Sequence, residues 1–438
     1  MKSYPKYRSP EPSGIENRQW PSNRITHVPV MVPVDLRDGN QAFAHPMDVE
    51  TKLRYFDLLV KLGFKEIEVG FPSASNPEYE FVRRLIDGRH IPDDVRIVVF
   101  TAAREPLIRR TVESIRGVRH AVVHSYIATS ELHRRFVFRK TEQELIRTAA
   151  DGTRLIAAML KDAGLYNSCA YEFSPEEFSD SRPGFIVSLA EEVRNAWGKS
   201  GKENFILNLP ATVERRPPNE YADMIELFTR QYSGMRETTL SVHTHNDQGC
   251  AVAAAEMALL AGAERVEGTL FGHGERTGNM DLVTFLLNLV SRGIETGIDF
   301  HDLPSVTAFV EKVAGIPVHP RHPYAGHLVF TAFSGTHQDA IRKGMNQREE
   351  ISRCFRQGWK VPYLLIDPAD IGRGYKDLIR INSQSGKGGV AWILESNYGI
   401  RIPPEIQPEL ARAVQKEAER SGGEISPEQI RRIYASLT

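Results

Sequence analysis

Strand-like segments alternate with helix-like segments over most of this chain, and few folds accept such an alternation. Apolar residues with helical periodicity mark segments such as 142–163, 184–197 and 221–232. Eight strand-like runs are present, at 28–34, 66–70, 96–100, 120–127, 168–173, 205–212, 239–245 and 266–271. Eight strands that alternate with helices over about 250 residues predict an α/β fold, the (β/α)8 TIM barrel, with a doubly wound open sheet as the alternative. No G-x-G-x-x-G sequence follows the first strand, which argues against a dinucleotide-binding sheet.

The same pattern predicts three parts of the chain. Residues 1–27 are rich in proline and charge and are expected to form an extended N-terminal arm. Residues 28–315 carry the barrel, and residues 316–438 form a smaller α-rich region that would serve as a lid or a dimer arm. Within it, Gly386-Lys-Gly-Gly predicts a glycine-rich turn, because it lacks the spacing of a phosphate-binding loop.

Composition limits the possible partners and the location. The 55 Lys and Arg residues balance 56 Asp and Glu residues, and a net charge of −1 argues against a general nucleic-acid binder. No signal peptide and no run of 18 apolar residues is present, so no membrane association is expected. The three cysteines, Cys169, Cys250 and Cys354, form no C-x-x-C motif, which favours a reducing, cytoplasmic location.

Polar residues gather at the predicted strand ends. His243 and His245 are two apart on a strand and therefore point to the same face. A barrel brings its strand ends to one face, so residues far apart in sequence meet there. Aspartate, histidine and asparagine without a thiolate suit Zn²⁺, Mn²⁺ or Mg²⁺. The candidates at this face are Asp38, Glu172, Thr212, His243, His245 and Asn279.

An open site on such an ion can chelate a 2-keto acid through its carboxylate and keto oxygens. Arg37 could then stabilise the oxygen that becomes negative, or it could simply pair with Asp38 at a turn. His337 and Tyr363 belong to the second region, where each is either a structural hydrogen-bonding residue or a catalytic one.

Several runs together resemble one known family. They are Leu36-Arg-Asp-Gly-Asn-Gln, Glu66-Ile-Glu-Val-Gly-Phe-Pro-Ser-Ala-Ser, Asn208-Leu-Pro-Ala-Thr-Val-Glu, His243-Thr-His-Asn-Asp, Gly272-His-Gly-Glu-Arg-Thr-Gly-Asn, Phe333-Ser-Gly-Thr-His-Gln-Asp-Ala and Asn382-Ser-Gln-Ser-Gly-Lys-Gly-Gly. The chain resembles the 2-isopropylmalate synthases of the DRE-TIM metallolyase superfamily. His-x-His alone is not specific, but this combination of runs is.

The resemblance implies an acyltransferase of leucine biosynthesis. Acetyl-CoA loses a methyl proton, its enolate attacks a metal-bound 2-keto acid such as 2-ketoisovalerate, and hydrolysis of the thioester releases CoA and 2-isopropylmalate or a related 2-alkylmalate. By motif position, the divalent metal (Zn²⁺, Mg²⁺ or Mn²⁺) would be held by Asp38, His243, His245 and Asn279. Arg37 would support the developing alkoxide, and Glu172 would assist acid–base chemistry.

The resemblance also implies binding roles. Gly272, Gly274 and Glu275 would lie near the CoA thioester, and Thr212 and His124 would contact the keto acid. His337 and Tyr363 match a pair that the family delivers, across a homodimer, to the partner's barrel.

Two features depart from the family pattern. A typical member continues into a leucine-binding regulatory domain, and these 438 residues are expected to comprise the catalytic portion without it. The keto-acid pocket is also altered, because Phe100-Thr-Ala replaces the usual Leu-Thr-Gln, and Ile127-Ala replaces the usual Asn-Ser. Phe100 and Ile127 would then contact the substrate and could redirect the enzyme to another 2-keto acid, or the changes could be neutral.

Two other hypotheses remain from the sequence. A metal-dependent retro-aldol or thioester lyase of the same superfamily would share the barrel and metal without needing His337 and Tyr363. A catalytically inactive binding protein would be expected to lack metal ligands, yet all four candidates are present.

Overall fold

The computed structural model describes residues 10–375 and 378–437, and the chain divides into two compact units. The first unit extends to Ile298 and the second begins at Asp299. Helix α9 (Leu303–Ala314), which the sequence pattern assigned to the barrel region, therefore belongs to the second unit. Of the residues assigned to the arm and to the α-rich region, 1–9, 376–377 and Thr438 lie outside the described part.

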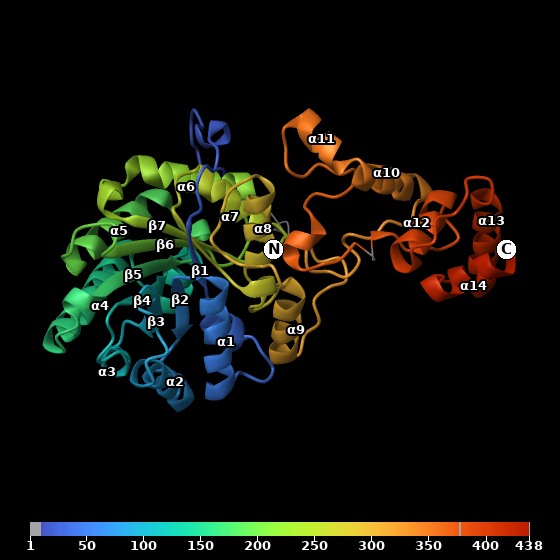
Figure 1. Ribbon diagram of the computed structural model, residues 1–438. Helices are drawn as coiled ribbons and strands as arrows, with labels where there is room; N and C mark the ends of the chain where they lie inside the picture. The colour runs from blue at the N-terminus through green and yellow to red at the C-terminus, as the bar shows by residue number, and fades with distance from the viewer. Residues whose placement is uncertain (1–9, 376–377, 438) are drawn as a thin grey trace, which may run out of the picture. The chain divides into compact units, whose positions relative to one another are not determined.

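The first unit is a barrel of parallel strands (Figure 1). The hydrogen-bonded order is β1-β8-β7-β6-β5-β4-β3-β2, and its two end strands, β1 and β2, also contact each other. The sheet therefore curls on itself, which confirms the barrel and excludes the open sheet. The strands are β1 Val30–Pro33, β2 Glu66–Gly70, β3 Arg96–Ala102, β4 Ala121–Ala128, β5 Cys169–Glu176, β6 Phe205–Ala211, β7 Thr239–Thr244 and β8 Arg265–Gly268.

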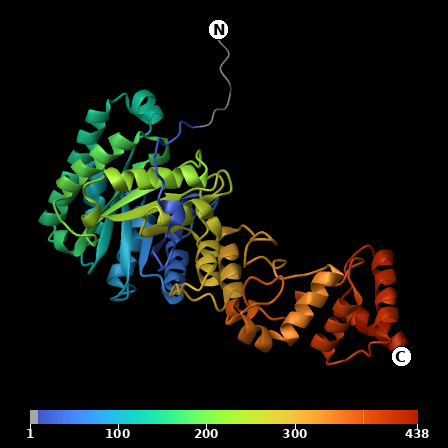
Figure 2. The same cartoon turned by 90° about the horizontal axis from the view of Figure 1, so that it is seen from above.

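Helices surround these strands, as the view in Figure 2 shows. Local sequence determines where they begin and end. The Asp48 side chain accepts a hydrogen bond from the Thr51 N–H at the start of α1, and Gly63 ends that helix at a φ of 106°. The helices of this unit are α1 Val49–Leu62, α2 Asn76–Asp87, α3 Glu105–Ser114, α4 Glu142–Asp162, α5 Pro183–Trp197, α6 Pro218–Gln231, α7 Ala251–Leu260 and α8 Leu282–Ser291.

Two strands end three residues away from the ends that the sequence predicted. Strand β5 continues to Glu176, beyond the predicted end at residue 173. Strand β8 ends at Gly268, whereas the prediction continued to residue 271. The chain leaves β8 because Leu270–Gly272 forms a tight turn in which Phe271 has a φ of 61°, a conformation that no strand accepts. Both differences change which side chains reach the face of the barrel that carries the site.

Buried side chains, both apolar and charged, fill the barrel interior, so the barrel is a packed core rather than a channel. One layer is formed by Val32, Val34, Val98, Val122, Ala170 and Ile206, all buried and drawn from several strands or their ends. Because side chains alternate along a strand, Val122 faces the same way as His124 two residues later. On such a face the polar residue comes after the apolar layer and therefore lies nearer the carboxyl end of the strand.

The described part of the N-terminal arm packs on its own barrel. Trp20 is buried, and its indole N–H donates to Asp223 Oδ1 of α6 at 2.9 Å. Arg18 pairs with the same carboxylate, and the Gln19 N–H donates to Glu226 of α6. Two buried acidic residues of α6 therefore hold the arm in place.

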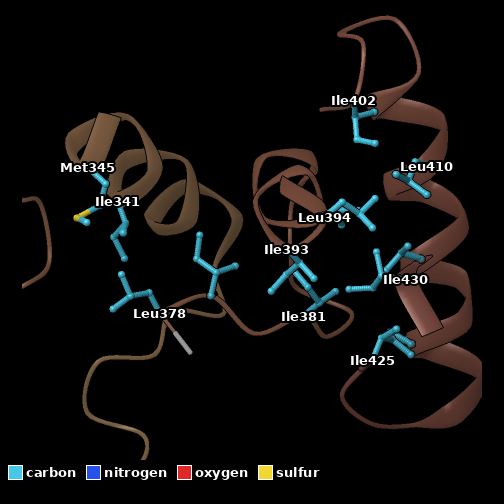
Figure 3. Close-up of a cluster of buried hydrophobic side chains, with 14 of the residues drawn as sticks. Ile341, Met345, Leu378, Ile381, Ile393, Leu394, Ile402, Leu410, Ile425 and Ile430 are labelled. Atoms are coloured by element: carbon cyan, nitrogen blue, oxygen red, sulfur yellow. The ribbon is translucent and has the colours of Figure 1, made fainter. Parts of the chain in front are cut away.

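The second unit has its own core, part of which is drawn in Figure 3. Its helices are α9 Leu303–Ala314, α10 Gly335–Asn346, α11 Arg348–Phe355, α12 Lys387–Tyr398, α13 Gln407–Ser421 and α14 Pro427–Leu437. Ile341 of α10, Leu394 of α12, Leu410 of α13 and Ile430 of α14 all contribute to it. The sequence predicted a turn at Gly386-Lys-Gly-Gly, but Lys387 already begins α12, and Gly389 is needed because a side chain there would collide with Gln338. Among the described residues, no helix is long and apolar enough to span a bilayer.

Candidate active site

A cavity of about 240 Å³ opens where the barrel strands end. Eight of the residues that the sequence singled out line it, namely Arg37, Asp38, Phe100, His124, Thr212, His243, His245 and Glu275. They come from segments on most sides of the barrel, so the fold gathers them as the strand-end argument predicts. Eight further residues complete the lining, namely Gln41, Tyr126, Ser174, Glu176, Asn208, Pro210, Glu267 and Arg276.

Asp38, His243 and His245 form one compact group of possible metal ligands. Asp38 Oδ2 lies 3.5 Å from His243 Nε2 and 3.9 Å from His245 Nε2. The two Nε2 atoms are 3.3 Å apart. All three side chains are buried, and separations of this size allow one ion to reach every ligand atom.

Asn279 contacts this group through both its backbone and its side chain. It forms an isolated antiparallel bridge with His245, and its Nδ2 donates to Asp38 Oδ2 at 2.8 Å. Its Oδ1 is buried and has no hydrogen-bond partner among the described residues. Nδ2 also donates to the His273 carbonyl at 2.9 Å; exchanging the amide N and O, which have nearly the same shape, gives up that bond and turns the oxygen toward the other ligands. Two nitrogens and two oxygens then converge, and this donor set fits a divalent ion.

The two histidines of this group titrate very differently. Burial acts to lower the pKa of His243, but hydrogen bonds and charge from Asp38 and Glu267 outweigh it and raise the pKa to about 9. Burial and the nearby His243 charge lower the pKa of His245 to about 4. Although burial opposes ionisation, Arg37 and the two histidines hold the pKa of Asp38 below its usual range. Without an ion, the group therefore carries one charged histidine and one carboxylate at neutral pH.

Arg37 lies in the turn Asp35–Gly39 that follows β1. Its Nη1 donates to Asp38 Oδ1 at 2.7 Å, and its Nε donates to the buried Glu68 of β2. Burial would lower the pKa of Arg37, but the charges of Glu68 and Asp38 raise it overall. Arg37 therefore does pair with Asp38, as its simplest interpretation predicted, and it also lines the cavity.

A hydrogen-bonded polar network forms the floor of the cavity. His124 places Nδ1 2.8 Å from Glu68 Oε2 and Nε2 2.7 Å from Ser174 Oγ. Asn208 donates to Ser174 Oγ at 3.0 Å and to Glu267 Oε2 at 3.2 Å. Glu267 Oε2 also lies 2.8 Å from His243 Nδ1, which leaves Nε2 of that histidine to face the ligand group.

Glu172 is not among the residues that line the cavity. It is fully buried inside the barrel, where Arg265 donates to both of its carboxylate oxygens at 2.8 and 2.9 Å. Burial raises the pKa of Glu172 well above its usual range. Together with His124 and Glu267 it forms a second group of carboxylate and imidazole ligands, but its oxygens are already held by Arg265.

Glu176 occupies the position at the cavity that the sequence argument gave to Glu172. Because β5 continues to residue 176, the side chains of Glu172, Ser174 and Glu176 all lie on the same face of the strand. The last two reach the cavity. Four residues of strand separate Glu172 from Glu176, a distance of about 13 Å. Burial, followed by the charge of Glu177, raises the pKa of Glu176. A carboxyl that lines the cavity and has a raised pKa holds its proton more strongly than an exposed glutamate does.

An aromatic wall bounds another side of the cavity. The Phe100 ring stacks on Tyr126 with centroids 4.8 Å apart, and the Arg37 guanidinium lies 4.4 Å from the Phe100 centroid. Ile127 does not line the cavity, because it alternates with Tyr126 on β4 and points to the opposite face. Tyr126 takes the place that the sequence argument gave to Ile127.

The loop from Gly272 to Asn279 forms one edge of the site. Glu275 lines the cavity and accepts a hydrogen bond from Gln41 at 2.7 Å, while Gly272 and Gly274 lie outside the lining. Gly274 has a φ of 158°, and any side chain there would collide with the Asn279 amide. This glycine therefore makes room for a possible metal ligand.

His337 and Tyr363 meet on the second unit. Their rings stack with centroids 4.0 Å apart. His337 is exposed, and Tyr363 is 63% exposed with a left-handed φ of 64°. The structure thus brings together two residues that lie 26 positions apart in the sequence, and it presents both to solvent.

Sequence reasoning missed the charged residues inside strands. Glu66 and Glu68 in β2 and Arg265 and Glu267 in β8 interrupt otherwise apolar segments. Buried charges are rare unless they are paired, so two charged residues spaced two apart within a strand are a signal of such a network.

Two family profiles match this sequence. Residues 29–310 match a profile described as HMGL-like, and residues 327–395 match one described as alpha-isopropylmalate synthase, post-catalytic domain-like. The 2-isopropylmalate synthase of Ralstonia nicotianae is 50% identical over 429 residues, which cover 98% of this chain and 73% of that protein. This chain belongs to the 2-isopropylmalate synthase family. Two other relatives with that name, from Cupriavidus taiwanensis (51% identity, 98% and 74% coverage) and Thermobifida fusca (50%, 98% and 77%), agree.

The family is one of enzymes, and its barrel fold extends to more distant proteins. The hydroxymethylglutaryl-CoA lyase of Pseudomonas aeruginosa matches 66% of this chain and 94% of its own, with a TM-score of 0.53 and 20% identity. The HMG-CoA lyase of Brucella melitensis matches 66% of this chain and 100% of its own, with a TM-score of 0.51 and 20% identity. At such identities the likeness concerns the fold alone.

Proposed function

We propose that this member of the 2-isopropylmalate synthase family condenses acetyl-CoA with a 2-keto acid, 2-ketoisovalerate in the first instance, and hydrolyses the thioester to 2-isopropylmalate and CoA. The observation that carries the proposal is the convergence of Asp38, His243 and His245 beside Arg37 in one cavity of a family member, with Asn279 hydrogen-bonded to Asp38. That donor set and a neighbouring cation suit a substrate with adjacent carboxylate and keto oxygens.

The cavity residues divide the chemistry among them. Asp38, His243, His245 and Asn279 would hold a divalent ion, which when bound supplies a Lewis acid for the keto group. Glu267 orients His243 through its Nδ1, so that Nε2 faces the substrate side. Arg37, held by Glu68 and Asp38, keeps a fixed positive charge beside the keto oxygen that becomes an alkoxide.

Binding and proton transfer fall to residues around this centre. Glu176 in place of Glu172 would move a proton, because it reaches the cavity and its pKa is raised. His124 and Thr212 would contact the keto acid, and Glu275 with the Gly272–Gly274 turn would lie beside the CoA thioester. Phe100 and Tyr126 would contact the side chain of the keto acid.

The His337–Tyr363 pair would act in a homodimer. It stands exposed on the second unit, and Leu365 nearby in sequence is 68% exposed. An exposed aromatic pair with a strained backbone suits a surface that another chain covers. We propose that this surface meets the barrel of a partner subunit.

A panel of 2-keto acids tests the function. Purified protein would be incubated with Mn²⁺, Mg²⁺ or Zn²⁺ and acetyl-CoA, and free thiol would be measured with pyruvate, 2-ketoisovalerate, aromatic and dicarboxylic keto acids. Release of thiol with 2-ketoisovalerate is the expected result, and a D38N variant is expected to abolish it. A preference for another acid would assign a selectivity role to the Phe100–Tyr126 wall, which is the feature that favours this second possibility. No release with any acid would refute the condensation.

A further inference from the structure

Glu177, the residue after Glu176, has an unusual backbone conformation. Its φ is 58°, in the left-handed region that residues other than glycine adopt only where their surroundings hold them. The residue is 7% exposed, and it does not line the cavity. Its strained conformation lies at the point where β5 ends and the chain turns, immediately after Glu176, which lines the cavity.

Two residues of the loop after β4 hold the Glu177 side chain. Glu177 Oε2 lies 2.6 Å from His133 Nδ1, and the same oxygen accepts a hydrogen bond from the Ser130 hydroxyl. Ser130 Oγ also accepts the backbone N–H of His133 at 3.2 Å, so the three residues support one another. We call Ser130, His133 and Glu177 the carboxylate clamp.

The backbone around Glu177 is bonded to cavity residues and to their neighbours. The Glu177 N–H donates to Thr212 Oγ1 at 2.9 Å. The Glu177 carbonyl accepts from Ser181 Oγ at 2.9 Å, and the Glu176 carbonyl accepts from both the N–H and the hydroxyl of Thr129. A rotation of the Glu176–Glu177 peptide would therefore break the bond to Thr212 and both bonds from Thr129, which together fix the backbone that carries the Glu176 side chain.

We propose that the carboxylate clamp is a positioning device that holds the Glu176 carboxyl and the Thr212 hydroxyl in place at the substrate cavity. The inference rests on the proposed function, because it assigns the clamp a role in that reaction. A left-handed Glu177 is maintained only if something compensates for its strain, and the two contacts of its carboxylate do so. The clamp residues are positioning residues, since none of them lines the cavity.

The charges of the clamp act on Glu176 in opposite directions. Burial is the largest factor that raises the pKa of Glu176, the Glu177 carboxylate raises it further, and His133 lowers it. Removing His133 would therefore take away one of the two groups that oppose the effect of Glu177 on Glu176, the other being Arg37. The geometry and the charge pattern both connect the clamp to the same carboxyl.

Kinetics of two disruptive variants and one conservative variant test the role. His133→Ala and Glu177→Ala are expected to lower kcat by about 10–100-fold, the scale of a misplaced catalytic group, with the KM for acetyl-CoA within about twofold of wild type. His133→Asn keeps a donor at the place of Nδ1 and is expected to recover most of kcat. His301→Ala removes a similar pair, 2.7 Å long, from Asp299 on the second unit and should leave kcat unchanged.

Crystal structures of the same variants provide a readout that needs no turnover. In Glu177→Ala the φ at residue 177 should become negative, and both the Glu176 carboxyl and the Thr212 hydroxyl should leave their wild-type positions. If the wild type releases no thiol, the proposed function fails and these structures alone decide about the clamp. Unchanged Glu176 and Thr212 positions, or an unchanged kcat in both alanine variants, would overturn the inference. If Glu177→Ala does not fold, His133→Ala provides both measurements.

Discussion

Binding of a divalent ion should release close to one proton from the Asp38–His243–His245 group at pH 7.5. The perturbation is titration of Mn²⁺ into metal-free protein. His243 is the group that must change, because an imidazole nitrogen binds metal only without its proton and the pKa of His243 in this structure is about 9. His245, with a pKa of about 4, and the ionised Asp38 are already deprotonated at pH 7.5.

The magnitude follows from that pKa. A group that titrates near 9 is about 0.9–1 protonated at pH 7.5, so each ion bound displaces about that number of protons. Below pH 9 protons compete with the ion for His243, so the affinity for the ion falls as the pH falls. Apparent affinity should therefore weaken by about tenfold for each pH unit between 9 and 6, and the dependence should flatten above pH 9.

Isothermal titration calorimetry in buffers of different ionisation enthalpy measures the protons released. Glu267→Gln provides a mechanistic variant, since Glu267 is one of the two carboxylates that raise the pKa of His243. It should release fewer protons at pH 7.5. Glu264→Gln, which changes an exposed carboxylate paired with Lys202, is the matched control and should behave as wild type. If the wild-type protein released almost no protons on binding the ion, His243 would be neutral in the metal-free protein. That result would refute the assignment of a raised pKa to His243.

Three other changes have defined expectations. Arg265→Leu leaves the buried carboxylates of Glu66 and Glu267 and the Glu172 carboxyl without their shared cation, and should cost about 3–5 kcal/mol in urea unfolding at pH 7. Arg265 lowers the pKa of Glu66 and Glu267 against the effect of burial, so this stabilisation is present above about pH 4.5 and is lost as pH falls; an equal loss at pH 4 and pH 7 would contradict the account. Glu176→Gln should lower kcat by about 10²–10⁴-fold, whereas Glu172→Gln should lower mainly the stability of the protein. A larger loss of kcat in Glu172→Gln than in Glu176→Gln would exclude Glu176 as the proton-transfer residue. Phe100→Leu should shift the ratio of kcat/KM between 2-ketoisovalerate and a longer keto acid by about 10–200-fold, and a constant ratio would mean that the aromatic wall does not select the substrate.

The family profiles and relatives agree with the motif-based assignment, and the structure explains why those motifs are informative. Asp38 follows β1, His243 and His245 lie at the end of β7, and Asn279 follows the turn after β8. In a parallel barrel all strands end at one face, so residue type and position after a strand are sufficient to place a ligand group. The sequence therefore determined the barrel and brought the candidate ligand residues together with the neighbouring Arg37.

The depth and direction of individual side chains were decided only by the tertiary structure. Glu172 and Glu176 are both glutamates of one strand, and only the continuation of β5 to residue 176 places one inside the barrel with Arg265 and the other in the cavity. Ile127 and Tyr126 are neighbours, and a strand sends them to opposite faces, so a one-residue difference decides which of them lines the cavity.

Proton affinities and backbone strain also required the fold. His243 and His245 share one motif, yet Asp38 and the β8 carboxylate Glu267 raise the pKa of the first against the effect of burial, while burial and its charged neighbour lower that of the second. The left-handed Glu177 depends on His133 and Ser130, more than 40 residues earlier in the chain. Local sequence determines strand, helix and residue type, whereas burial, pairing and charge environment arise from contacts between segments that only the folded chain brings together.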